Sequence, residues 1–532
     1  MIRNVLIIIP PLTNPESDGD PNPNRPDFET RRLVSPVEPT TVAADLTGRG
    51  YAVTILDLGI LTHARYAELD RRLAACRADA VVVVQSILTF ATAMDWDGKR
   101  AFDLVRKRLP GAVTVLTGAQ PTNYPGEAVR AGLCDYALKG EVDFVVGDLL
   151  DALAGGASLD AIPGLARRGP DGAVLVSDRY PMVDVATLPV PAYGVLDAEH
   201  RQRYTEVLER GKIRFPTRSV RYRDVMTSRS CVLRCSFCSV AHLRGPQQKY
   251  RRKPLDLVVA EIEAALADGI EEIHFFDDLF AESEAQLLAF ADALARRNLR
   301  FAWFVGQGMP LWPLTRDALV ALKETGMYRI ICPFETGNDR VLRDVAGKVR
   351  SSVAHHERVA GWVRELDLEV IGLFVIGMPG ESRYEIRDTV RFAQDHPEID
   401  YSVFSIATPM VGTKLMRMVT REGRLDDAGK INRVIKRTVA LYRTDAFHEY
   451  EMGVIRTFDW DRINFSTPAR RAKYARMVGM TLEELEGARQ DARNVFARFF
   501  PDYDGPRSFL ELVDRPGLFP ELEPVIPEQL YA

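Results

Sequence analysis

The chain has 532 residues, enough for about three or four domains of roughly 150 residues each. Its composition, 46% hydrophobic and 27% charged, is that of an ordinary globular protein and excludes a disordered or low-complexity chain. The net charge of −5, from 69 basic and 74 acidic residues, argues against general nucleic-acid binding, and no apolar run reaches the roughly 18 residues of a membrane-spanning helix. The apolar run at residues 5–9 is too short for a signal peptide, so we expect a cytoplasmic protein that binds neither nucleic acid nor membrane.

Residues 1–185 alternate short apolar runs with helical stretches. Continuous apolar runs favour buried parallel strands, because both faces of such strands are covered. Strands are predicted at 5–9, 53–57, 81–85, 113–117 and 136–138, and helices at 41–46, 66–76, 99–109, 126–131 and 144–153. This order predicts an α/β domain with a doubly wound, Rossmann-like parallel sheet, which would bind a ligand beyond the carboxyl ends of its strands.

Short turns follow four of these strands. Each could be an ordinary connection between a strand and a helix, but together they indicate a rim that binds a ligand. The candidate contacts in these turns are Pro11, Ser86, Leu88, Gly118, Gln120, Gly140 and Glu141.

Residues 186–223 read as a linker, which begins with a Pro-rich stretch. Between Arg201 and Arg223 the linker carries eight basic and two acidic residues. This run is either a solvated face or a local site for a phosphate or carboxylate. In the second case Arg218 and Arg221 are candidate anion contacts.

A second alternating block covers residues 224–420. Its strands are predicted at 224–228, 270–276, 301–304, 328–332, 368–376 and 401–406, and its helices at 255–267, 283–296, 316–324, 353–366 and 385–394. Six such units predict a partial (β/α)6 barrel, with its chemistry at the carboxyl ends of the strands. Residues 421–532 are expected to form a mostly helical C-terminal region.

The strongest chemical signal is the segment Cys231-Val-Leu-Arg-Cys235-Ser-Phe-Cys238. Three thiolates on one loop can bind three irons of a 4Fe–4S cluster, leaving the fourth iron free to chelate S-adenosylmethionine. Zinc is the competing metal, with His242 as a possible fourth ligand, although structural zinc usually takes two Cys pairs. The other cysteines, Cys76, Cys134 and Cys332, are isolated in the sequence.

This loop follows the first barrel strand and has an aromatic residue before its last Cys, and it resembles the radical S-adenosylmethionine (radical SAM) superfamily. Phe275-Phe276-Asp277-Asp278, Pro333-Phe334-Glu335-Thr336-Gly337 and the glycine-rich segment around Gly377 resemble motifs at later strand ends of that family. The resemblance implies that S-adenosylmethionine is bound by Phe237, Asp277, Asp278, Gln307, Glu335 and Gly377. The acidic residues could instead cap the helices that follow their strands.

The N-terminal block resembles the cobalamin-binding domain that precedes the barrel in one class of these enzymes. The turns containing Ser86, Gly118 and Gln120 carry this likeness, whereas Lys139-Gly140-Glu141-Val142-Asp143 departs from the common Gly-Glu-Gly-Glu. The resemblance assigns the seven turn residues named above to cobalamin. No Asp-x-His-x-x-Gly motif is present, so we expect no histidine from that motif beneath cobalt, where Ile87, Leu88 or Thr89 could lie. A plain nucleotide-type fold remains the alternative.

The resemblance as a whole implies a cobalamin-dependent methyltransferase that uses a 4Fe–4S cluster, S-adenosylmethionine and cobalamin. Two segments, at residues 306–312 and 408–413, resemble phosphonate methylases of antibiotic biosynthesis and suggest a small substrate bearing phosphate or phosphonate. An external electron donor of the flavodoxin or ferredoxin type is implied as well. A radical rearrangement, ring contraction or oxidation with the same cofactors stays open. A tRNA methylthiotransferase is rejected, because such enzymes hold a second cluster on N-terminal cysteines that this chain lacks. A cobalamin sensor is rejected as well, because it would not need the three-cysteine cluster loop.

Overall fold

The computed structural model describes residues 2–10, 35–58, 60, 65–85, 98–196, 217–245, 249–423 and 442–514. The chain divides into two compact units. Unit 1 comprises Met1–Arg214 and Ala241–Ala265, and unit 2 comprises Phe215–Val240 and Leu266–Ala532. The segment Ala241–Ala265, which begins three residues after Cys238, therefore belongs to the N-terminal unit. The domain boundaries at 185, 223 and 420 stay a prediction.

Unit 1 contains a seven-stranded sheet in the order β2-β1-β3-β4-β5-β6-β7. Its strands are β1 (Asn4–Ile9), β2 (Ala52–Asp57), β3 (Ala80–Gln85), β4 (Val113–Gly118), β5 (Tyr136–Leu138), β6 (Leu165–Arg168) and β7 (Val174–Val176). The first five pair in parallel, and β6 and β7 add an antiparallel hairpin at one edge. The predicted doubly wound sheet is confirmed. Its strand order reverses between β1 and β3, the point at which such sheets bind ligands.

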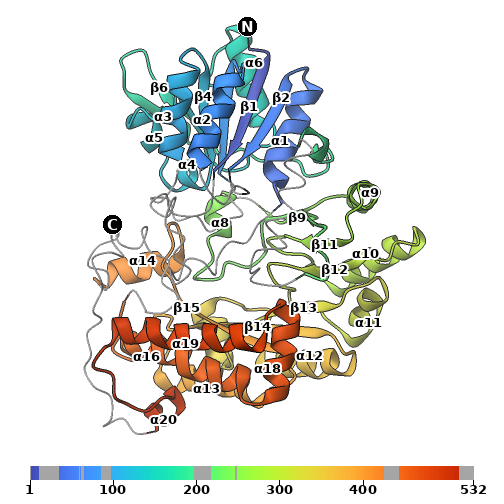
Figure 1. Cartoon of the computed structure of the whole chain (residues 1–532), viewed down its shortest axis with the longest axis vertical. Coiled ribbons are helices and arrows are strands. Elements are labelled where there is room, and N and C mark those ends of the chain that lie inside the picture. The colour runs from blue at the N-terminus through green and yellow to red at the C-terminus, as the bar shows by residue number, and fades with distance from the viewer. Residues whose placement is uncertain are drawn as a thin grey trace. The chain divides into compact units, whose positions relative to one another are not determined.

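Helices cover both faces of this sheet (Figure 1). They are α1 (Val37–Gly48), α2 (Arg65–Ala75), α3 (Gly98–Arg108), α4 (Ala119–Asn123), α5 (Glu127–Arg130) and α6 (Val145–Gly155), followed by the 3-10 turn η3 (Tyr193–Val195). Alternate residues of β1 face opposite ways: Ile7 packs in one core with α1 and α6, and Ile8 in another with α2, α3 and α5. Both cores are apolar because the sheet is covered on each side, which explains the continuous apolar strands.

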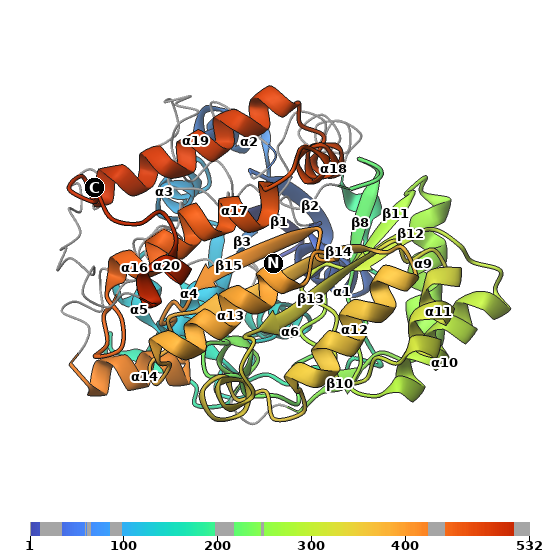
Figure 2. The same ribbon diagram turned by 90° about the horizontal axis from the view of Figure 1, so that it is seen from below.

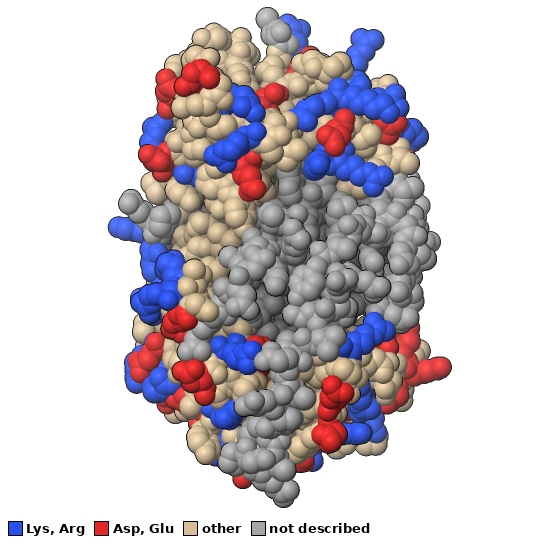
Figure 3. Space-filling model, turned by 90° about the vertical axis from the view of Figure 1, so that its left-hand side faces the viewer, with Lys and Arg blue, Asp and Glu red and all other residues tan. Residues whose placement is uncertain are grey.

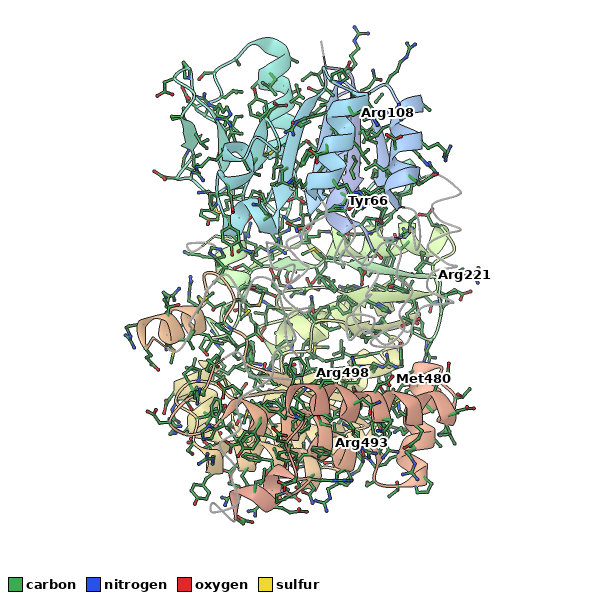
Figure 4. All side chains as sticks on the ribbon, turned by 60° about the vertical axis from the view of Figure 1, so that its left-hand side comes forward. Tyr66, Arg108, Arg221, Met480, Arg493 and Arg498 are labelled. Carbon is green, nitrogen blue, oxygen red and sulfur yellow. The ribbon has the colours of Figure 1, made fainter. Side chains whose placement is uncertain are left out.

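Polar side chains join the neighbouring helices α2 and α3, which carry Tyr66 and Arg108 respectively (Figure 4). The Arg108 guanidinium donates to Asp70 at 2.8 Å, and the Arg100 guanidinium lies 4.2 Å from the centre of the Tyr66 ring. The Arg108–Asp70 pair is partly exposed, so it contributes little to stability, whereas the Tyr66 ring is buried.

Unit 2 contains two parallel three-stranded sheets that together form a partial barrel. One has the order β12-β11-β8 and the other β13-β14-β15, and a parallel bridge from Trp303 to Met327 joins them. The strands are β8 (Tyr222–Val225), β11 (Glu272–Phe275), β12 (Ala302–Val305), β13 (Arg329–Glu335), β14 (Glu369–Ile376) and β15 (Tyr401–Ile406). The predicted six-stranded (β/α)6 barrel is confirmed. Two short strands, β9 (Ser228–Arg229) and β10 (Arg251–Arg252), lie outside it.

Helices follow the barrel strands and cover their outer side, as α12 and α13 do in Figure 2. The helices of unit 2 up to Asp395 are α10 (Glu284–Arg296), α11 (Arg316–Glu324), the π-helix η4 (Val341–Ala346), α12 (Val353–Glu365) and α13 (Arg383–Asp395). The earlier helices α8 (Val240–Leu243) and α9 (Leu255–Ala267) belong mostly to unit 1. Each of α10, α11, α12 and α13 begins after a Ser or Thr whose side chain accepts a backbone N–H of the first turn. This capping explains why the sequence marks their starts so clearly.

The C-terminal region is helical, as predicted. It contains α14 (Lys414–Arg421), α16 (Glu449–Val454), the π-helix η5 (Ile455–Asp459), α17 (Trp460–Phe465), α18 (Pro468–Val478), α19 (Leu482–Phe499) and α20 (Phe509–Val513). Asn464 of α17 exchanges two hydrogen bonds with the backbone of Ser402, at 2.7 and 2.9 Å, and so covers part of the last barrel strand. Among the helices in the described ranges, none is long and apolar enough to cross a membrane.

Candidate functional site

The three cysteines at 231, 235 and 238 lie on one loop that follows β8 and β9. All three are free and partly buried. Ser230, just before the first cysteine, has a φ of 66°, a left-handed conformation that few non-glycine residues adopt. Burial raises the pKa of all three thiols, that of Cys235 to about 12. Metal ligands are thiolates, and the irons of a bound cluster would stabilise that form.

The loop is not arranged as a site for a single metal ion. Within the described ranges, no group of three or more His, Cys, Asp and Glu side chains could hold one metal ion. An iron–sulfur cluster does not require thiolates that converge on one point, since each thiolate binds a different iron.

Two carboxylates at the end of β11 hold the backbone that leads into this loop. Asp277 Oδ1 accepts hydrogen bonds from the backbone N–H and hydroxyl groups of Thr227 and Ser228, and Asp278 Oδ2 accepts one from the Ser230 N–H at 2.8 Å. Burial raises the pKa of Asp277 to about 7. Asp277 Oδ2 is buried and has no hydrogen-bond partner among the described residues. Neither carboxylate caps the next helix, because Ser283 does so.

Glu335 lies at the end of β13, after a bulge in its pairing with β14. Its φ of 64° is again left-handed, which is strained for a residue with a side chain. Its Oε1 lies 2.7 Å from the ammonium of Lys348, and both side chains are buried. The same ammonium donates to the Pro333 carbonyl at 3.1 Å. Lys348 could not be singled out from the sequence, because it belongs to none of the motifs recognised there.

The chain next to Lys348 packs against the cysteine loop. The Ser236 N–H donates to the Ala346 carbonyl at 2.9 Å. A Cβ placed on Gly347 would lie 3.2 Å from the Arg234 carbonyl oxygen and 3.6 Å from the Cys235 Cα. The π-helix η4 and the residues after it therefore brace the loop that carries the cysteines.

The remaining residues assigned to S-adenosylmethionine have different surroundings. Gln307 and Phe237 are partly buried. Gly377 has a φ of 78°, and a Cβ there would meet the Met452 sulfur at 2.9 Å, while its carbonyl accepts from the Tyr442 hydroxyl at 2.7 Å. The C-terminal region thus packs on this turn after β14.

In unit 1, Pro11, Ser86 and Leu88 lie outside the described residues. Gly118 and Gln120 lie at the carboxyl end of β4, where the Gln120 N–H donates to Gln85 Oε1 at 2.8 Å. Thr117 Oγ1 and Gln120 Oε1 are buried and have no hydrogen-bond partner in the described part of the chain. Unpaired buried oxygens are costly, so these two mark a place where a ligand group could bind.

Two predicted turn residues have protein partners. The Gly140 N–H donates to the Thr122 hydroxyl at 2.9 Å. The fully buried Glu141 accepts two hydrogen bonds of 2.8 Å from the Arg251 guanidinium, which comes from the segment Ala241–Ala265. Arg244, also buried and from that segment, lies 3.7 Å from Glu141. The resemblance assigns Glu141 to cobalamin, which stays a prediction, and in the structure its carboxylate takes part in a bidentate ion pair. Nothing local predicted Arg251, which is 110 residues away.

The basic residues of the predicted linker are also paired where they are described. Arg221, which projects outward in Figure 4, pairs with Glu271, and Arg218 lies 3.8 Å from Glu369 and stacks on the Tyr328 ring. Over the described part of the face in Figure 3, basic and acidic side chains are interspersed. Arg218 and Arg221 therefore have acidic partners, in contrast to the anion contacts expected.

Residues 225–393 match the Radical SAM superfamily. The cytidylyl-2-hydroxyethylphosphonate methyltransferase of Streptomyces wedmorensis is 28% identical over 349 residues, covering 61% of this chain and 64% of that protein. The chain thus spans just under two thirds of the length of this relative.

Two solved structures share the fold. TsrM from Kitasatospora setae, a radical S-adenosylmethionine methyltransferase with cobalamin and a 4Fe–4S cluster bound, has a TM-score of 0.63 at 19% identity, covering 81% of this chain and 80% of TsrM. OxsB, a cobalamin-dependent S-adenosylmethionine radical enzyme with aqua-cobalamin and S-adenosylmethionine bound, has a TM-score of 0.65 at 13% identity, covering 97% of this chain and 75% of OxsB. The region at residues 225–393, which holds the three-cysteine loop at the first strand of the partial barrel, thus belongs to the Radical SAM superfamily.

Proposed function

We propose that the protein is a cobalamin-dependent radical SAM methyltransferase that acts on a small molecule. The observation that carries this proposal is the cysteine loop with its three free thiols. Asp278 binds the backbone at its start, and the residues just before Lys348 pack against it. The relatives named above support methyl transfer, since the Streptomyces wedmorensis protein and TsrM are both methyltransferases. When bound, the cluster and S-adenosylmethionine supply a radical that removes hydrogen from an unactivated carbon, and cobalamin supplies the methyl group.

The residues of unit 2 suit a cluster and S-adenosylmethionine. Cys231, Cys235 and Cys238 would hold the cluster, which leaves one iron without a protein ligand. Asp277 and Asp278 fix the entry to the loop, so they act on the position of the cluster through the backbone. The left-handed Glu335 is the carboxylate at a strand end best suited to contact S-adenosylmethionine. Phe237, Gln307 and Gly377 complete the proposed set.

The residues of unit 1 suit a buried polar ligand at the carboxyl edge of the sheet. The two unpaired oxygens, Thr117 Oγ1 and Gln120 Oε1, both lie at the end of β4 and could accept hydrogen bonds from the amide groups of cobalamin. TsrM and OxsB, which share the fold, both hold cobalamin. Gly118, Gln120 and Gly140 are the described residues proposed to line it, with Pro11, Ser86 and Leu88 from turns outside the described ranges.

The substrate is proposed to be a phosphonate or a nucleotide-linked phosphonate, following the named substrate of the Streptomyces wedmorensis relative. An antibiotic pathway, a cytoplasmic location and an electron donor of the flavodoxin or ferredoxin type belong to the same proposal. A second candidate is a non-methylating radical reaction with the same cofactors. OxsB favours it, because this enzyme is described as a cobalamin-dependent radical enzyme and not as a methyltransferase, and its fold covers 97% of this chain.

Product counting separates the two candidates. Reconstituted protein would be incubated with cobalamin, S-adenosylmethionine, a reductant and candidate phosphonates, amino acids or aminoglycosides. Methyl transfer predicts S-adenosylhomocysteine and 5′-deoxyadenosine in about equal amounts, one for each use of S-adenosylmethionine. Deoxyadenosine without S-adenosylhomocysteine, with a converted substrate, would contradict methyl transfer and favour rearrangement or oxidation.

A further inference from the structure

Lys348 is a buried cation beside the cysteine loop. Its side chain is 9% exposed, and the ammonium is held by Glu335 at 2.7 Å and by the Pro333 carbonyl at 3.1 Å. Burying an ion pair costs several kcal/mol of desolvation that the pair's attraction only partly offsets, so such a pair is weak evidence for a stabilising role. The placement of this one calls for another explanation.

The charges around Lys348 show which groups it acts on. Gly347, next to Lys348, lies against the cysteine loop, where a Cβ would be 3.6 Å from the Cys235 Cα, and the Lys348 ammonium opposes the rise that burial causes in the pKa of Cys235. Lys348 lowers the pKa of Cys231 as well, together with Arg350. His356, which also faces Lys348, contributes no positive charge, because burial lowers its pKa to about 3. Lys348 therefore places a buried positive charge next to the segment that carries Cys235.

We propose that Lys348 is a positioning residue whose buried charge raises the reduction potential of the cluster on Cys231, Cys235 and Cys238. The inference rests on the proposed cluster. Reduction adds one negative charge to a group already ligated by thiolates, and a nearby cation in a water-poor site favours that charge. Lys348 thereby makes the cluster easier to reduce. Its ion pair with Glu335 holds the ammonium at the strand end that is proposed to face S-adenosylmethionine.

The test compares two variants that differ only at residue 348. Removing Lys348 alone would leave Glu335 buried without its partner, so E335Q is the reference and K348M/E335Q is the test variant. Each full-length protein is reconstituted anaerobically with iron and sulfide, and the reduced cluster is quantified by electron paramagnetic resonance during a redox titration. R350M is the matched control, because Arg350 lies two residues away, also acts on Cys231, and is 48% exposed, so that solvent screens its charge.

At a fixed solution potential, K348M/E335Q should show about a tenfold lower ratio of reduced to oxidised cluster than E335Q, which corresponds to 59 mV for one electron. The reduction potential of the cluster in E335Q should be higher than in wild type, because a negative charge has been removed. A structural disturbance alone would not shift the potential up in E335Q and down again in K348M/E335Q. R350M should stay within about twofold of wild type.

Equal potentials for E335Q and K348M/E335Q, with the same iron content, would overturn the inference. If K348M/E335Q does not assemble a cluster, K348Q/E335Q is measured in its place. Loss of the cluster in both double variants would also overturn the inference, because the inference gives Lys348 an effect on the potential of a formed cluster. Wild-type protein without about four irons would instead contradict the proposed function.

Discussion

Most buried carboxylates of the described chain have compensating partners, and the kind of partner differs from site to site. Asp277 has four donors, Glu335 has Lys348, and Glu141 has Arg251. Glu381, in the turn after β14, is different. Its Oε2 accepts the Met378 N–H at 2.7 Å, but its buried Oε1 has no hydrogen-bond partner among the described residues.

This difference predicts a pH dependence. Burial raises the pKa of Glu381 from its ordinary 4.5 to about 8. Between these values the folded protein keeps a proton that the unfolded chain has lost, so stability should fall as pH rises, by at most about 1.4 kcal/mol per pH unit. E381Q should therefore lose less stability than wild type between pH 5 and 8, measured by urea midpoints. E385Q is the control, because the hydrogen bond from Arg340 lowers the pKa of Glu385 to about 2, so its contribution is lost only below this window. Parallel pH profiles for wild type and E381Q would contradict the prediction.

At the scale of elements, the sequence predicted the strands and helices whose pattern is long or capped. The predicted strand 401–406 and helix 255–267 match β15 and α9. The hairpin of β6 and β7 was missed, because strands of four and three residues with half-exposed side chains carry no periodic signal. The short helix α4 was missed because it directly follows β4, where a turn was expected.

Gly118, whose assignment to cobalamin stays a prediction, has a structural reason to be glycine. A Cβ at this residue would lie 1.3 Å from the Gln85 carbonyl oxygen of the neighbouring strand, at a φ of 102°. G118A should therefore destabilise unit 1 by at least about 3 kcal/mol even without cobalamin, because the two strand ends must separate. Hydrogen exchange of the β3 and β4 amides would measure this change.

The control is G50A. Gly50 also has a positive φ, of 90°, but nothing lies within 4 Å of its would-be Cβ, so only the conformational cost of about 1–2 kcal/mol is expected. Equal effects of G118A and G50A would show that the contact with Gln85 is not what requires glycine.

At the scale of the whole molecule, the sequence predicted the α/β sheet, the six-stranded partial barrel and the superfamily, because each has a local pattern. It did not predict contacts that join distant segments. Arg251 binds Glu141 from a segment that lies in the sequence between two barrel strands. Ala346 and Gly347, just before Lys348, pack against the cysteine loop more than 100 residues earlier. Such pairings follow from tertiary packing and leave no spacing to recognise.

The most direct test of the proposed cofactors is the iron and cobalt content of anaerobically reconstituted protein supplied with cobalamin. The account predicts about four irons and one cobalt per chain. Replacing Cys231, Cys235 and Cys238 by Ala should remove the iron and leave the cobalt, because these cysteines lie in unit 2 and the proposed cobalamin residues in unit 1. C76A and C134A should keep both metals. Iron that survives the triple replacement, or wild-type protein that holds iron but no cobalt, would contradict the account.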